Sequence, residues 1–78
     1  MSWNHRILAH EENGEVYLQM HDVHYDPDGK PIRYTESAVR VGGEDVAAIA
    51  WTLEKMKEAC NSPILWAGDK FPLEYEGK

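Results

Sequence analysis

The spacing of hydrophobic residues in this chain changes once, at Gly42-Gly43. Before this pair, apolar and polar residues alternate as in β-strands; after it, apolar residues recur every three or four positions, as in an α-helix. A chain of 78 residues has room for one small core. A sheet and a helix in so short a chain must bury their apolar faces against each other. The sequence therefore predicts an α+β fold in two layers.

Two turn sequences divide the alternating region. Asn13-Gly14 is typical of a two-residue hairpin turn with positive φ at both positions, and residues 26–30 (DPDGK) have the composition of a second reverse turn. The apolar positions between these turns change parity, so we expect a β-bulge near His21 and Asp22. The prediction is a three-stranded antiparallel β-meander (β-β-β-α with the helix) whose strands cover residues 3–11, 15–26 and 31–39.

The helical region is predicted to pack on one face of this meander. Asp45 is the expected N-cap, and Ser62-Pro63 ends the helix. The β-β-β-α domain then covers residues 1–62, and residues 63–78 form a C-terminal tail or edge extension. The stripe expected to dock on the sheet consists of Val46, Ile49, Ala50, Leu53, Met56 and Cys60.

The tail is too apolar to lie free in water. Phe71, Leu73 and Tyr75 alternate as in a strand, but Pro72 confines such a strand to a sheet edge. The tail is predicted either to fold back over its own sheet or to pack on a second copy in a two-fold homodimer, and we favour the homodimer. Because aromatic residues are enriched at the centres of interfaces, the predicted interaction residues are Trp51, Trp66, Phe71, Leu73 and Tyr75.

His21 and His24 are the weak candidates for metal ligands. Their odd spacing places them on opposite faces of a strand, unless the bulge lies between them, and a tetrahedral site needs three or four converging ligands. We therefore expect solvent-facing histidines and no metal. Cys60, the only cysteine, excludes an internal disulfide and is expected to be buried. Without a catalytic triad order, phosphate loop or zinc-protease motif, we predict no enzyme, no catalytic residue and no cofactor.

Composition narrows the possible partners. The net charge of −6 argues against nucleic acid, whose binding needs clustered Lys and Arg. The longest apolar run, residues 46–51, is far shorter than the ~20 residues of a membrane span. The single cysteine and a start without the features of a secretory signal indicate a cytoplasmic protein.

Four short segments carry a resemblance to known proteins. They are WNHR (3–6), HDVHYDPDGKPI (21–32), TLEKMKEA (52–59) and SPIL (62–65). With them the chain resembles a widespread group of short, uncharacterised bacterial proteins, from which it departs at His5 and His24, where an aromatic is expected. The resemblance implies a similar fold and a cytoplasmic protein, and it implies no activity.

The function predicted from the sequence is that of a small, non-catalytic protein-interaction module. One alternative is an antitoxin-like or inhibitor protein that covers a basic partner, which would suit the negative charge. Another alternative is a metal or small-ligand binder that uses its histidines.

Overall fold

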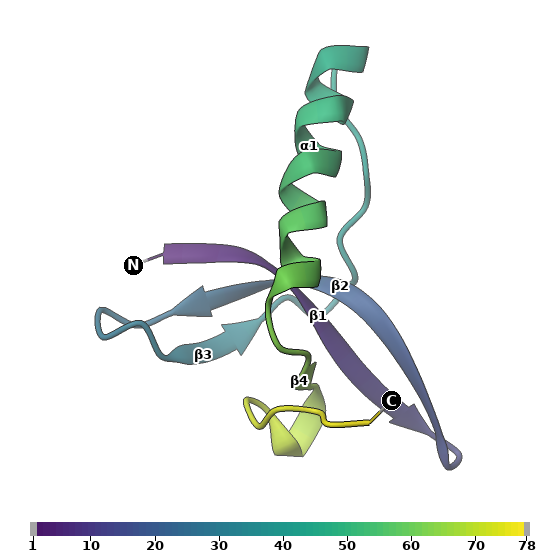
Figure 1. Ribbon diagram of the computed structural model, residues 1–78, viewed down its shortest axis with the longest axis vertical. Coiled ribbons are helices and arrows are strands. Elements are labelled where there is room, and N and C mark those ends of the chain that lie inside the picture. The colour runs from purple at the N-terminus through teal and green to yellow at the C-terminus, as the bar shows by residue number, and fades with distance from the viewer. Residues whose placement is uncertain (1, 78) are drawn as a thin grey trace.

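The computed structural model describes residues 2–77 and has an α+β fold with one α-helix and a four-stranded mixed sheet (Figure 1). The order of the strands in the sheet is β3-β2-β1-β4, and β4 runs parallel to β1 while the other neighbours are antiparallel. The prediction of three antiparallel strands was therefore incomplete, because the tail adds a fourth strand. The elements are β1 (Ser2–Glu12), β2 (Glu15–Tyr25), β3 (Pro31–Tyr34), α1 (Val46–Glu58), a 3₁₀ turn η1 (Ala59–Asn61), β4 (Leu65–Trp66) and a second 3₁₀ turn η2 (Gly68–Lys70).

The hairpin of β1 and β2 has the predicted turn. Asn13 and Gly14 have φ angles of 55° and 83°, as a two-residue turn of this type requires. From this turn the pairing runs without interruption to Ser2 opposite Tyr25. The bulge predicted near His21 and Asp22 was wrong, and the irregularity lies between β2 and β3 at His24/Tyr25. No bulge is needed because the apolar residues nearest the turn, Val16 and Leu18, are exposed.

The third strand is shorter than predicted and ends at Tyr34 instead of residue 39. Two single hydrogen bonds keep the following segment beside β2: Thr35 N donates to Asp22 O (3.0 Å) and Val39 N donates to Met20 O (2.8 Å). These isolated bonds form no continuous ladder, so residues 35–45 are a connection that leads away from the sheet to α1.

The core lies on the sheet face that carries Leu8 and Val23, and Leu65 of β4 completes it. Phe71 from the tail and Tyr34 from β3 pack against this cluster. The tail thus folds back on its own sheet, which is one of the two arrangements predicted for it.

Arg6 is buried beside this core and ties the sheet to the segment before β4. Its guanidinium donates hydrogen bonds to the Tyr25 hydroxyl and to the Pro63 carbonyl, both at 2.8 Å. Burying a charged group is costly unless its donors are used. These two bonds therefore hold Pro63, and with it the start of the tail, against the sheet.

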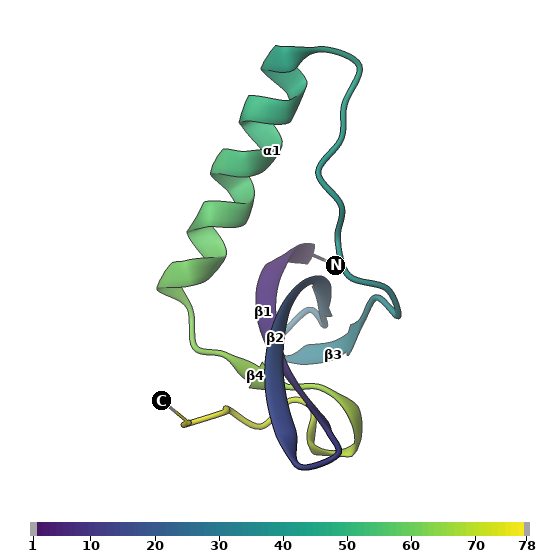
Figure 2. The ribbon, with the colours of Figure 1, turned by 90° about the vertical axis from the view of Figure 1, so that its right-hand side faces the viewer.

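Helix α1 begins at the predicted cap, where the Asp45 side chain accepts a hydrogen bond from Ala48 N (2.8 Å). The helix and the connection before it extend away from the sheet in both views (Figures 1 and 2). Within residues 2–77, no helix has the length and apolar character needed to cross a membrane.

The predicted docking of the whole apolar stripe of α1 was wrong. Met56 is the buried residue of this helix, while Leu53 is 51% exposed and Val46 is 81% exposed. Cys60, expected to be buried, is also exposed. The helix contacts the sheet near its C-terminal end only, because its axis diverges from the sheet toward its N-terminal end (Figure 2).

Candidate functional site

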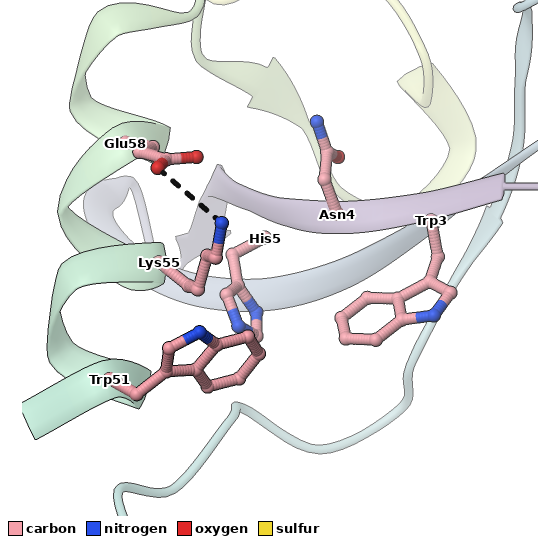
Figure 3. A pocket seen from close by; sticks show the side chains of 6 residues that line it. All are labelled: Trp3, Asn4, His5, Trp51, Lys55 and Glu58. Atoms are coloured by element: carbon pink, nitrogen blue, oxygen red, sulfur yellow. Dashed lines mark ion pairs between the residues drawn. The ribbon is translucent and has the colours of Figure 1, made fainter. Parts of the chain in front are cut away.

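A cleft opens where α1 diverges from the sheet. It has a volume of about 380 Å³, within the range of ligand and side-chain pockets. We call it the helix–sheet cleft, and Figure 3 shows its lining, which consists of Trp3, Asn4 and His5 from β1 and Trp51, Lys55 and Glu58 from α1.

His5 and Asp22 form a close pair at the sheet side of the cleft. The hairpin register places them directly opposite each other on neighbouring strands, and His5 Nδ1 lies 2.7 Å from Asp22 Oδ1. Both atoms are buried, and their contact lacks the alignment of a hydrogen bond. The Trp3 ring meets the His5 ring edge to face, with centroids 5.5 Å apart. The imidazole is thus held between a carboxylate and an indole.

Two half-exposed indoles form the walls of the cleft. Trp3 is 55% exposed and Trp51 is 61% exposed. Lys55 Nζ lies 5.6 Å from the centre of the Trp51 ring and 3.8 Å from Glu58 Oε2. Since exposed ion pairs of this kind contribute little, Lys55 is free to contact a partner. The cleft therefore offers flat apolar surface together with one cation and one anion, which suits binding.

The predicted interaction residues do not form one site. Trp51 lies in the helix–sheet cleft, whereas Trp66 and Tyr75 pack edge to face within the tail, with centroids 5.0 Å apart. The Phe71 ring packs on the Tyr34 ring, with ring centroids 4.9 Å apart. Of the four predicted interaction residues in the tail, Leu73 is exposed, whereas the other three are partly buried.

His21, expected to face solvent, is fully buried and pairs with His10 instead of His24. The two Nε2 atoms lie 2.9 Å apart, and His21 Nδ1 lies 2.8 Å from the Thr35 carbonyl oxygen. Register explains this pairing: even-numbered residues of β1 share a sheet face with odd-numbered residues of β2, and His24 lies on the other face, opposite Trp3.

These contacts define where the protons of the two histidines lie. A carbonyl oxygen only accepts, so His21 Nδ1 must carry a hydrogen and donate it to Thr35. In the neutral ring His21 Nε2 then accepts, and His10 Nε2 donates to it. Burial, and second the neighbouring His21, lower the pKa of His10 below its ordinary value. The lowered pKa favours the neutral form of the His10 ring.

The residues predicted for interaction or metal binding did not include Trp3, His5 and Lys55 of the cleft or His10 of the histidine pair. The signal for His5 and His10 was available, because the Asn13-Gly14 turn alone determines which residues of β1 and β2 share a face. The expected bulge reversed the parity and hid this signal. Nothing in the sequence spacing places Lys55 of the helix beside β1.

Comparison of the chain with family models, with curated proteins and with solved structures gave no match. The resemblance to the group of short bacterial proteins stays a prediction. Among residues 2–77, no three His, Cys, Asp or Glu side chains come together as a metal-ligand group.

Proposed function

We propose that this chain is a non-catalytic protein-interaction module of the cytoplasm. Its docking surface comprises the side of α1 that carries Val46 and Leu53, and the helix–sheet cleft on another side of the same helix. The observation that supports this proposal most is the exposure of large apolar side chains on α1 and the neighbouring strand. Val46 and Leu53 are exposed on one side of the helix, and Trp51 is exposed on another side, in the cleft with Trp3 of β1.

An isolated helix as short as α1, with 13 residues, is only marginally stable in water. Helices of this length depend on packing of their apolar side, and here only Met56 is buried within the helix. A partner that covers Val46 and Leu53 on one side of α1, and reaches Trp51 in the cleft, would supply the missing packing. Tryptophan is also enriched among the residues that dominate binding energy.

The partner that we propose is a second copy of the chain, in a two-fold dimer. Helix α1 carries no net charge, although the chain has a net charge of −6. Two copies that meet through α1 therefore repel each other less than two copies that meet through an acidic surface would. A two-fold contact brings the same apolar side chains together from both copies. The charged residues of α1 are Glu54, Lys55, Lys57 and Glu58.

Sedimentation velocity over a wide range of concentration tests the dimer. The parent should dimerise, and Leu53→Glu should raise the dissociation constant about 100-fold or more, because an unpaired charge buried in an interface costs about 3–5 kcal/mol. The matched control is Leu73→Glu, which places the same charge at an exposed leucine of the tail. This control should dimerise like the parent.

A parent that stays monomeric at every concentration would exclude self-association. A Leu53→Glu variant that dimerises as tightly as the parent would exclude the Leu53 side of α1 as the contact. Binding of monomeric parent to a purified basic protein, lost in Leu53→Glu, would instead support the antitoxin-like or inhibitor function. Circular dichroism of each variant establishes that it is folded.

A further inference from the structure

The His10–His21 pair lies on the sheet face opposite the helix–sheet cleft. We propose that this pair binds one divalent transition metal ion of the kind that prefers imidazole ligands, zinc or copper(II), through the two Nε2 atoms. This site is independent of the proposed interaction function, since it shares no residue with α1 or with the cleft.

The orientation of His21 supports this proposal. Metal-bound histidines commonly donate their other ring N–H to a backbone carbonyl or carboxylate, which directs the free nitrogen at the metal. His21 Nδ1 makes such a bond to Thr35 O, at 2.8 Å. The Tyr34 ring also packs edge to face on the His21 ring, with ring centroids 5.4 Å apart. Both contacts hold His21 Nε2 toward His10.

The distance between the two Nε2 atoms is close to that in a metal site. Zinc–nitrogen bonds of about 2.0–2.1 Å at tetrahedral angles place two ligand nitrogens about 3.3 Å apart. The observed separation of 2.9 Å thus needs an opening of only about 0.4 Å. The ion takes the place of the hydrogen between the rings, and the neutral His10 ring carries its proton on Nδ1 instead.

The His10 side of the pair is open to an entering ion. His10 is partly buried and stacks on Tyr17, with ring centroids 5.1 Å apart. Both residues line a second cavity of about 340 Å³, whose lining also includes Glu11 and Glu12. Since no third metal-ligating side chain joins the pair within residues 2–77, water in this cavity completes the coordination. The carboxylates of this lining favour the approach of a cation.

Zinc titration of tag-free full-length protein tests the site. An ion that binds only the folded state raises the melting temperature as its concentration rises. We expect one zinc ion per chain by calorimetry and a rise in melting temperature for the parent. His10→Gln should show neither effect. His24→Gln, on the opposite face, should behave like the parent and serves as the matched control.

Copper(II) electron paramagnetic resonance of the parent gives a second readout that needs no His10 variant, should His10→Gln fail to fold. Coupling to two imidazole nitrogens, retained in His24→Gln and in His5→Gln, would support the site. The proposal is overturned by an unchanged melting temperature of the parent at saturating zinc. It is equally overturned by zinc binding that is the same in His10→Gln and the parent, or by copper coupled to fewer than two imidazoles.

Discussion

Gly14 illustrates how much one residue contributes to the hairpin of β1 and β2. Its φ angle is 83°, and a Cβ atom built at this position meets no other atom within 4 Å. Alanine here would therefore strain the backbone without any steric clash. We expect Gly14→Ala to lower the free energy of unfolding by about 1–2 kcal/mol, the cost of the left-handed conformation for a residue with a Cβ. Urea unfolding followed by circular dichroism measures this loss.

Gly42 is the matched control for this prediction. It also has open space around an added Cβ, but its φ is not in the left-handed region. Gly42→Ala should leave stability unchanged or raise it slightly, because alanine restricts the unfolded chain. Equal losses in both variants would show that backbone strain at the turn is not the cause.

The histidines show where sequence reasoning fails at the residue scale. The turn at Asn13-Gly14 was predicted correctly because its chemistry is local. The partners of His10 and His21 depend on the register of the hairpin, and one wrongly expected bulge reverses the face of every residue beyond it on its strand. The burial of His21 also depends on Thr35, which lies beyond β3 and far from the pair in sequence.

At the scale of elements, α1 was predicted well as a helix and poorly as a packing unit. Its cap at Asp45 and its end before Ser62-Pro63 follow from local signals. Hydrophobic periodicity indicates that a helix has an apolar side, but not what covers that side. In this molecule the stripe divides into a buried end at Met56 and an exposed part at Leu53.

This division predicts different effects of truncating the two side chains of α1. Met56→Ala should lower the free energy of unfolding by about 2–5 kcal/mol, the usual range for a buried methionine. In the monomer, Leu53→Ala should change it by about 0.5 kcal/mol or less, as expected for a surface position. Thermal and urea unfolding at low protein concentration provide the comparison. Similar losses in both variants would contradict the diverging helix.

At the scale of the whole molecule, the tail completes the core. Ending the chain after Ser62 removes Leu65 and Phe71 from the core cluster and removes the Pro63 carbonyl that accepts from Arg6. A buried guanidinium that loses its acceptor is strongly destabilising. We expect this truncated chain to be unfolded by circular dichroism and by the dispersion of its amide NMR signals.

Ending the chain after Tyr75 is the control, because it keeps Leu65, Phe71 and the pair of Trp66 with Tyr75. This longer chain should fold like the parent. A folded chain that ends at Ser62 would show that β1, β2 and β3 form a sufficient core with α1 alone.

Strand β4 could not have been predicted from the sequence. It consists of Leu65 and Trp66 only, and two residues show no periodicity. Its position depends on the β1 edge that it joins, through the pairing of Leu65 with Leu8. The apolar composition of the tail indicated correctly that these residues pack against a protein surface. It did not indicate which surface this is.

The pairing of Leu8 with Leu65 has a consequence for the speed and yield of refolding. A hairpin such as β1–β2 forms in about 1–10 μs, whereas the contact between Leu8 and Leu65 must close a long loop of chain, and folding slows as such distant contacts come to dominate. During this delay the Leu8 and Val23 side chains are open to other chains. Transiently exposed apolar surface of this kind promotes aggregation, so the yield of refolded protein should fall as the chain concentration rises.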